Sequence, residues 1–330
     1  MTGMKMRLDV ETWRCDPPFR ISGYVFESIE LLVVTLTQGG KTGRAEASGV
    51  YYRGETARSM AATLEGLRGV IEQGITRQVL QRALPAGGAR HALDCALWDL
   101  EARLSGVPVW QLAGLEEPRP LLTTFTCGVG SPEEMAARAR RYGEARALKL
   151  KLTGDAVDAA RVRAVREARP DIWLGVDANQ GLTRAALERL MPALVECGVA
   201  LIEQPFPVGS DAWLDGLRSP IRIAADESVQ TSADIAGLAG RVDVINIKLD
   251  KAGGLTEGLA MATAARAHGL EVMVGCMVGT SLGMAPAYLL GQHCTVVDLD
   301  GPVLLAADRS PACSYAGGMI AAPDALWGGA

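Results

Sequence analysis

The fold of this chain is decided by five short segments between residues 147 and 250: Ala147-Leu-Lys149-Leu-Lys151, Gly175-Val-Asp177-Ala-Asn179, Leu201-Ile-Glu203-Gln-Pro205, Ala224-Ala-Asp226-Glu227-Ser228 and Ile245-Asn-Ile-Lys248-Leu249. Each is a short apolar run that ends in charged residues, and a helical pattern follows it. This alternation is typical of buried parallel strands joined by helices. In a barrel of parallel strands, the carboxyl ends of the strands share the rim that carries the active site.

Three acids, Asp177, Glu203 and Asp226, stand at the ends of consecutive candidate strands. They follow one another at intervals of about 25 residues, which is the length of a strand, a helix and two short loops. The acids are therefore expected to meet at one rim. Three carboxylates without His or Cys favour a hard, oxygen-binding dication, most often Mg²⁺. The alternative for each acid taken alone is a solvated side chain in a loop.

Eight candidate strands make up the second part of the chain, at residues 122–127, 147–152, 172–176, 200–202, 221–225, 242–248, 270–276 and 295–299. Helical patterns separate them, as at residues 132–142, 156–168 and 184–197. Eight parallel strands with intervening helices predict a barrel. Gly301-Pro302 and irregular chain follow the last strand, and no clear eighth helix is predicted.

The first part of the chain has a different pattern. Candidate strands at residues 6–12, 28–37 and 42–47 predict an antiparallel meander with a Gly39-Gly40 turn. Two loops are expected beside it, at residues 16–26 and 50–54. Residues 56–111 are helical in pattern, and the clearest helix, at 91–104, is stopped by Gly106 and Pro108.

These patterns predict three parts. An α+β domain spans residues 1–118, with strands first and helices after. The barrel spans residues 119–305. Residues 306–330 are expected to fold back on the first domain.

Lysines on the predicted barrel strands suggest proton transfer. Lys149 and Lys151 alternate along one strand, so both point into the barrel, and Lys248 ends a strand four further on. A lysine base needs a pKa well below its usual value of about 10.4, and a neighbouring ammonium group or a dication lowers it. Lys151 and Lys248 would flank a bound molecule, so that one removes a proton from carbon while the other delivers one to the opposite face. A metal between them would stabilise the enediolate, as in a racemase or epimerase. The alternative for Lys248 is a structural ion pair with a metal-ligand acid.

A further acidic pair, Asp298-Leu-Asp300, ends the eighth candidate strand, and both carboxylates face the same side. They could add metal ligands or hold a cationic part of the substrate. Because three acids already serve the metal, a substrate ammonium group is expected. The alternative is a strand-end turn capped by Asp.

Composition limits the classes of partner. The 330 residues carry a formal net charge of −5 and no basic block, which argues against nucleic acid. No secretory signal core or apolar run of membrane-spanning length is found. Seven cysteines show no Cys-x-x-Cys pattern, which favours reduced thiols in the cytoplasm. The three histidines have no ligand spacing and are interpreted as structural.

At this point the chain resembles a known family. The set Lys149-x-Lys151, Asp177-x-Asn179, Glu203-Gln-Pro, Asp226-Glu227-Ser and Lys248 is similar to the enolase superfamily, muconate-lactonizing subgroup. Residues 246–257, Asn-Ile-Lys-Leu-Asp-Lys-Ala-Gly-Gly-Leu-Thr-Glu, together with Gly275-Cys-Met277 and Asp298-Leu-Asp300-Gly-Pro, most resemble dipeptide epimerases of the L-Ala-D/L-Glu type.

The resemblance implies an α+β domain that caps a modified barrel, (β/α)7β. It implies an isomerase that inverts the α-carbon of the C-terminal residue of a dipeptide. The implied roles are Mg²⁺ ligands for Asp177, Glu203 and Asp226, acid and base for Lys151 and Lys248, tuning of Lys151 for Lys149, support for Asn179 and Glu227, and ammonium binding for Asp298 and Asp300. The cap loops would choose the side chain, and the predicted substrate contacts there and in the barrel are Tyr24, Phe26, Tyr52, Arg53 and Met277. Many barrels of this kind associate, so a homo-oligomer is a further expectation.

The chain departs from the family in the first cap loop. Members that act on a C-terminal Glu tend to carry an Arg there after Pro-Phe, whereas here Arg20 directly follows Phe19 and the loop is shorter. Either Arg53 in the second loop supplies the cation, or the substrate is less acidic.

Other reactions on the same scaffold stay open: cycloisomerase, o-succinylbenzoate synthase, and racemase of N-acyl or betaine-type amino acids. The pair of Asp298 and Asp300 disfavours substrates that lack a cation. Acid-sugar dehydratases are disfavoured because Gly275-Cys-Met277 offers no His base. A barrel that only binds a ligand is the alternative from another class.

Overall fold

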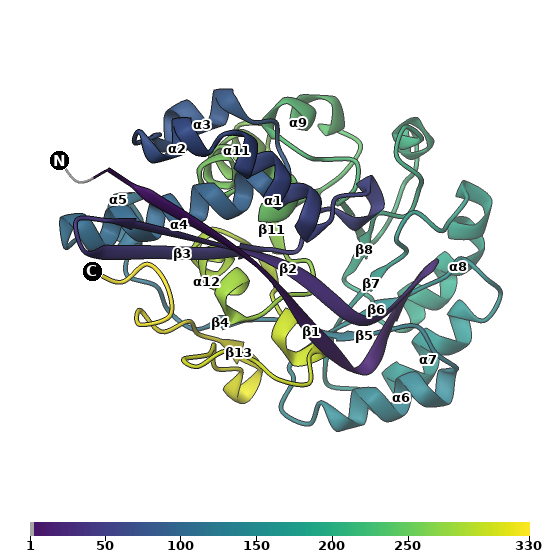
Figure 1. Cartoon of the computed structure of the whole chain (residues 1–330). Helices are drawn as coiled ribbons and strands as arrows, with labels where there is room; N and C mark the ends of the chain where they lie inside the picture. Colours follow the sequence, from purple (N-terminus) through teal and green to yellow (C-terminus); the bar gives the residue numbers. More distant parts are fainter. Residues whose placement is uncertain (1–2) are drawn as a thin grey trace.

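The computed structural model describes residues 3–330 and begins with an antiparallel sheet and its helices (Figure 1). The sheet has the strand order β1-β2-β3, and α4 packs across β2 and β3. α4 ends where Gly106 takes a left-handed conformation, with φ of 70°, as the sequence predicts. The elements of this cap are β1 (Lys5–Ile21), β2 (Tyr24–Gln38), β3 (Lys41–Ala47), the 3-10 helix η1 (Tyr51–Arg53), α1 (Ala57–Gly66), α2 (Arg68–Glu72), α3 (Arg77–Ala83), α4 (Gly88–Ser105) and α5 (Val109–Leu112).

The prediction of a loop at residues 16–26 is wrong. β1 continues through this stretch, and β2 begins after a two-residue turn, Ser22-Gly23. Pairing shifts its register between Arg14 and Phe19. Two prolines, Pro17 and Pro18, lie in that interval, and they made the sequence look like a loop. Prolines are nevertheless tolerated where the pairing of a strand is irregular. We call residues 16–26 the cap arm. In Figure 1 the β1–β2 hairpin extends from the N-terminus towards β5, β6 and β7.

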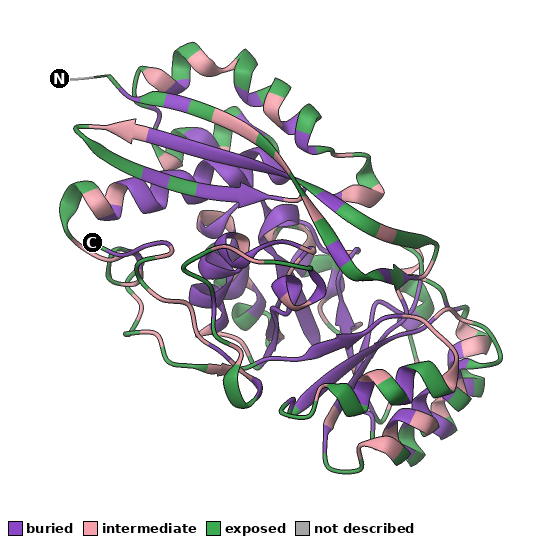
Figure 2. Ribbon diagram, turned by 60° about the horizontal axis from the view of Figure 1, so that its bottom comes forward, coloured by how far each residue is buried: buried purple, intermediate pink, exposed green. Residues whose placement is uncertain are grey.

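The barrel prediction is confirmed. Eight parallel strands follow the order β5 to β12 without interruption, and Figure 2 shows barrel strands that are buried, whereas the cap strands alternate between buried and exposed positions. The strands are β5 (Phe125–Cys127), β6 (Ala147–Lys151), β7 (Trp173–Asp177), β8 (Leu201–Glu203), β9 (Arg222–Ala225), β10 (Val244–Lys248), β11 (Glu271–Gly275) and β12 (Val296–Asp298). The helices between them are α6 (Pro132–Arg141), α7 (Asp158–Ala168), α8 (Arg184–Glu196), η2 (Asp211–Leu214), α9 (Ser232–Leu238), α10 (Leu249–Ala252), α11 (Leu255–Ala267) and α12 (Ser281–Gly291).

The first barrel strand is shorter than predicted. Residues 122–127 divide into β5 and a separate strand, β4 (Leu121–Leu122), which pairs with β13 (Met319–Ile320) near the C-terminus. Between them, the backbone N–H of Thr124 donates to the carbonyl of Val297 in β12 over 2.9 Å. This bond connects the chain just before the first barrel strand, β5, to the last strand, β12. The sequence shows residues 122–127 as one apolar run. It does not show that the start of this run pairs with β13 while the rest pairs with β6.

The chain after β12 contacts the cap. It contains η3 (Gly301–Leu304), η4 (Ala316–Gly318) and β13. The backbone of Gly328 bonds to Val109 and to the carboxylate of Asp99, each over 2.8 Å. Arg309 forms ion pairs with Glu11 over 2.8 Å and with Glu46 over 2.7 Å. The predicted boundaries at residues 118 and 305 stay predictions.

An apolar layer closes the lower end of the barrel. Its buried members are Leu201, Ala224, Val244, Met273 and Val296, which come from the starts of five strands or from their middles. Side chains rather than a pore therefore fill the barrel, and the charged residues at the strand ends lie above this layer. Among residues 3–330, none of the helices is both long and apolar enough to cross a membrane.

The contact between β3 and α4 gives a first prediction. A Cβ atom added to Gly43 would lie 2.3 Å from the backbone nitrogen of Leu100 and 2.4 Å from the carbonyl of Ala96. Neither backbone atom can move without shifting the helix, so Gly43→Ala should destabilise the protein by about 2–3 kcal/mol. Gly66→Ala is the control, because nothing lies within 4 Å of its added Cβ. Thermal unfolding followed by circular dichroism should show a lower Tm for Gly43→Ala alone, and an unchanged Tm would contradict the tight contact.

Candidate active site

Three carboxylates converge at the rim of the barrel. Asp177 and Glu203 are the last residues of β7 and β8, and Asp226 follows β9. One carboxylate oxygen from each lies within 4.8 Å of the others, and all three residues are buried. The prediction that these acids meet is thus confirmed. Burying three negative charges together is costly unless cations neutralise them.

Lysines flank this cluster on two sides. Lys149 and Lys151 lie on β6, with the Nζ of Lys151 2.5 Å from Asp177 and the Nζ of Lys149 3.0 Å from Glu203. Lys248 ends β10, and its Nζ lies 2.7 Å from Asp226. β6 and β10 are four strands apart in the barrel order. Two ammonium groups, those of Lys151 and Lys248, therefore approach the carboxylate cluster from opposite sides.

The pKa values of Lys149 and Lys248 are raised, whereas a lysine that acts as a base needs a lowered pKa. Burial of Lys149 and Lys248 does disfavour their charge, but nearby carboxylates outweigh burial and raise the pKa of each well above its usual value. Asp298 and Asp226 are the largest of these carboxylate contributions for Lys149 and Lys248, respectively. Burial also raises the pKa of Glu203, to about 7. The negative charge of the cluster thus holds protons on Lys149 and Lys248.

The two acids after β12 have unequal surroundings. Asp298 accepts hydrogen bonds from Lys149 and from the hydroxyl of Thr124. Asp300 accepts from the backbone N–H of Thr126 over 2.6 Å, and burial raises its pKa to about 6. Sequence reasoning treated the pair as equivalent. The structure commits Asp298 to Lys149 and leaves Asp300 with the freer carboxylate.

Asn179 and Glu227 lie beside the acids. The Nδ2 of Asn179 donates to Asp177 over 3.1 Å and lies 3.4 Å from Glu227. Burial, followed by the charge of Asp226, raises the pKa of Glu227 to about 8. Within residues 3–330, one buried side-chain oxygen of Asn179 and one of Glu227 lack a hydrogen-bond partner. These unpaired buried oxygens lie next to three carboxylates. Together they are a group of oxygen atoms that could bind a cation.

Two contributors were missed by sequence reasoning. Asn246 lies two residues before Lys248 on β10 and donates to Glu203 over 2.8 Å. Lys251, in α10, lies 2.5 Å from Asp226 and is also buried. Period-2 alternation from Lys248 could have identified Asn246. Nothing in the sequence indicated that Lys251 turns back under the rim.

A cavity of about 40 Å³ lies between the lysines and the two acids after β12. Of the substrate contacts predicted outside the charged set, Met277 lines this cavity, and Tyr24, Phe26, Tyr52 and Arg53 do not. Its remaining walls include Phe19 of the cap arm, Cys276 and Leu304, none of which was predicted.

Three of the predicted cap residues, Tyr24, Phe26 and Tyr52, form an aromatic cluster around Tyr51. Tyr24, at the tip of the cap arm and 45% exposed, packs edge-on against Tyr51 with ring centroids 4.8 Å apart. Tyr51 also contacts Phe26 and Tyr52 edge-on. Burial raises the pKa of Tyr51, and the charge of Lys248 opposes the rise. The cluster thus lies close enough to the rim to feel its charges, whereas Arg53 is exposed.

Comparison with known proteins identifies related chains. Residues 4–114 match the family model of the mandelate racemase / muconate lactonizing enzyme N-terminal domain, and residues 133–326 match that of the enolase C-terminal domain-like proteins. The L-Ala-D/L-Glu epimerase of Escherichia coli (strain K12) is 40% identical over 312 residues, which are 94% of this chain and 97% of that protein.

Two solved structures share the fold closely. An enolase family member from Agrobacterium tumefaciens with homology to dipeptide epimerases, holding sodium and L-Ala-L-Glu, has a TM-score of 0.95 and 42% identity, covering 98% of this chain and all of that one. A dipeptide epimerase from Methylococcus capsulatus, complexed with Mg and L-Arg-D-Lys, has a TM-score of 0.90 and 34% identity, covering 98% of each chain. Similar scaffolds thus hold dipeptides of different charge.

Proposed function

Because the chain belongs to the mandelate racemase / muconate lactonizing enzyme family of enolase-like proteins, we propose that it is a Mg²⁺-dependent dipeptide epimerase. It inverts the α-carbon of the C-terminal residue by removing a proton from one face of this carbon and delivering a proton to the opposite face. The observation that supports this most is the approach of Lys151 and Lys248 to one carboxylate cluster from opposite sides. Inversion at carbon needs an acid and a base on opposite faces, which is what this arrangement offers.

The carboxylate cluster fits Mg²⁺. Asp177, Glu203 and Asp226 offer oxygen atoms only, which hard dications prefer. We assign these three residues as its ligands, with Asn179 and Glu227 in support. Bound there, Mg²⁺ would supply positive charge to the substrate carboxylate and to the negative charge that develops as the α-proton leaves.

Lys151 and Lys248 have to leave their carboxylate partners before they act. The cavity of about 40 Å³ between them is too small for a dipeptide, so the ammonium groups must withdraw from Asp177 and Asp226 as the substrate enters. The lysine that serves as base first releases its own proton to solvent, so that it can accept the α-proton, and the other lysine keeps its proton for delivery to the opposite face. Lys149, which is held by Glu203 and Asp298, stays charged and places a positive charge beside Lys151 on the same strand, which is the tuning role that we assign to it.

The α-ammonium group of the dipeptide is assigned to the acids after β12. Asp300 is the main partner, because the carboxylate of Asp298 is engaged with Lys149 and Thr124. A charge-assisted hydrogen bond in a buried site would give a preference for dipeptides over N-acyl amino acids. This preference separates the proposal from the racemase alternative.

Deuterium uptake tests the proposed function. Pools of L,L-dipeptides with acidic, apolar and basic C-terminal residues are incubated with the protein and Mg²⁺ in D₂O and analysed by mass spectrometry. A gain of one dalton at the C-terminal residue is expected in at least one pool. Uptake by N-acyl or betaine-type amino acids alone would favour the racemase alternative. Uptake by no substrate would favour a cycloisomerase or a barrel that only binds.

Asp300→Asn should weaken recognition of the free amino terminus. We expect the wild-type protein to prefer a dipeptide over its N-acetylated form, and the variant to lose about tenfold or more of this preference in kcat/KM, as for one charge-assisted hydrogen bond. The N-acetylated dipeptide is the internal control, because it carries no ammonium group. Equal losses on both substrates would refute the ammonium role of Asp300.

We also propose that the protein works in the cytoplasm. All seven cysteines are free thiols, and five of them are buried, which suits a reducing compartment. Association into a homo-oligomer stays a prediction.

A further inference from the structure

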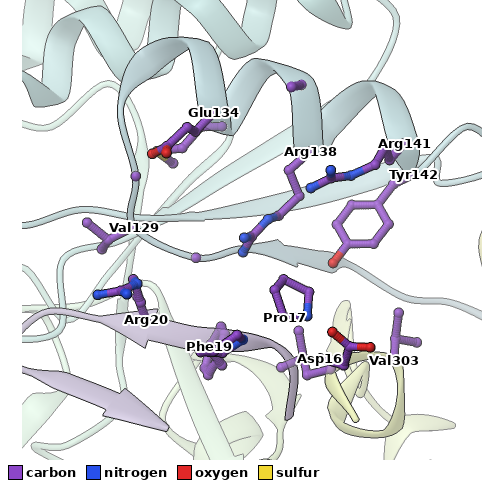
Figure 3. A pocket seen from close by; sticks show the side chains of 16 residues that line it. Asp16, Pro17, Phe19, Arg20, Val129, Glu134, Arg138, Arg141, Tyr142 and Val303 are labelled. Carbon is purple, nitrogen blue, oxygen red and sulfur yellow. The ribbon is translucent and has the colours of Figure 1, made fainter. Parts of the chain in front are cut away.

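A second cavity lies beside the lysine cavity and is much larger, about 630 Å³. Figure 3 shows it between the cap arm below and the end of α6 above. Residues 16–20 of the arm, residues 128–130 after β5, and α6 supply most of its wall. The cap and the barrel therefore build it jointly, and neither part would form it alone.

Three arginines give this cavity its charge: Arg20 from the cap arm, and Arg138 and Arg141 from the last turn of α6. Within residues 3–330, none of their side chains forms an ion pair or donates a hydrogen bond. In Figure 3 the side chain of Arg138 extends into the cavity. A Cβ atom on Gly128 would lie 3.1 Å from this guanidinium group, so the glycine leaves room for it.

Two carboxylates, those of Asp16 and Glu134, also line the cavity, and within residues 3–330 neither forms an ion pair with the three arginines. Glu134 caps the start of α6 by accepting from the backbone N–H of Ser131 over 2.8 Å. Asp16 lies on the side of Val303 in Figure 3. The favourable helix dipole accounts for basic residues in the last turn of α6. It does not account for Arg20, which the cap brings to the same cavity.

The arginine cavity borders the place assigned to the amino terminus of the substrate. Phe19 and Leu304 line both this cavity and the lysine cavity. Asp300 accepts from the N–H of Thr126, and the carbonyl of Thr126 accepts from the hydroxyl of Tyr142 over 3.3 Å. Tyr142 in turn lines the arginine cavity. A single residue of β5 thus separates the ammonium site from the arginine side.

We propose that the arginine cavity receives a carboxylate carried by the N-terminal residue of the dipeptide, so that the enzyme acts on dipeptides that begin with Asp or Glu. This inference rests on the proposed function, because the ammonium site at Asp300 fixes where that residue lies. With its ammonium group there, the N-terminal side chain reaches past Phe19 and Leu304 towards Arg138 and Arg141. Free guanidinium groups in a preformed cavity bind carboxylates through charge-assisted hydrogen bonds.

The test compares L-Glu-L-Xaa with its neutral isostere L-Gln-L-Xaa, where Xaa is the residue that the pooled exchange experiment favours. The wild-type ratio of kcat/KM, Glu over Gln, should be about tenfold or more. In the double variant Arg138→Gln/Arg141→Gln the ratio should fall to about one. Arg140→Gln removes the same charge from the same helix, but Arg140 does not line the cavity, so this control should keep the wild-type ratio and rate.

Each other outcome has a defined meaning. A wild-type ratio of one or below overturns the inference, as does a ratio that the double variant retains. If the double variant does not fold, Arg141→Gln and a salt titration of the wild-type ratio replace it, and a ratio insensitive to salt overturns the inference. If succinate changes the rate with L-Ala-L-Xaa in the wild type only, and the Glu/Gln ratio is one, the cavity binds a separate anion and the substrate assignment is wrong. No exchange with any dipeptide would refute the proposed function itself.

Discussion

Lys151→Ala and Lys248→Ala are each expected to abolish epimerisation, with a loss of about 10³-fold or more in kcat, since general acid–base catalysis alone contributes about 10²–10⁴-fold. Each variant removes the proton donor or acceptor from one face of the α-carbon only. The remaining lysine can still exchange the α-proton of the epimer whose C–H bond points towards it. We therefore expect each variant to catalyse deuterium exchange on one epimer without inverting it, and the two variants to differ in which epimer they exchange.

Mass spectrometry of both epimers in D₂O, with chiral chromatography for inversion, makes this measurement. Lys41→Ala is the control, because Lys41 is the exposed first residue of β3, far along the chain from the active-site strands, and should behave as the wild type. Magnesium binding should persist in both active-site variants, because they keep all three carboxylates. Full turnover by either variant would refute the two-base mechanism.

Removal of the metal is expected to have the second large effect. Treatment with a chelator should lower activity by about 10³-fold or more, because the positive charge that stabilises the reacting carboxylate is lost. Added Mg²⁺ should restore it. The fold should survive, since Lys151, Lys248 and Lys251 each lie within 2.7 Å of a carboxylate of the cluster and neutralise it.

Circular dichroism after chelation tests the second half of this prediction, and activity tests the first. Glu203→Gln is the companion variant, because it removes one ligand charge and should raise the Mg²⁺ concentration needed for half-maximal activity. Activity that resists the chelator would remove the metal from the mechanism.

The barrel was predictable from sequence because its signals are local. Each buried strand is an apolar run of a few residues, and its charged last residue marks the rim, so Asp177, Glu203 and Lys248 were identified with their neighbours. The acid cluster followed from the topology of a closed parallel barrel. These features need only the order of the strands and no detail of side-chain packing.

The parts that were missed depend on contacts between distant segments. The cap arm carries prolines and a shifted register, so its strands do not alternate in a regular way. The pairing of Lys149 with Asp298 joins residues 149 positions apart. The arginine cavity arises only where the cap meets α6. No local sequence pattern predicts these contacts, because they depend on how the cap packs against the barrel.

The cap arm also suggests how related enzymes diverge. Its tip is the two-residue turn Ser22-Gly23. A Cβ atom added to Gly23 would have no neighbouring atom within 4 Å. Insertions in an exposed hairpin tip cost little stability, yet here they would change the surface that faces the open end of the barrel. The lysines and carboxylates belong to other strands and would stay in place. Substrate choice can therefore drift through the length of one hairpin while the proton-transfer chemistry is inherited unchanged.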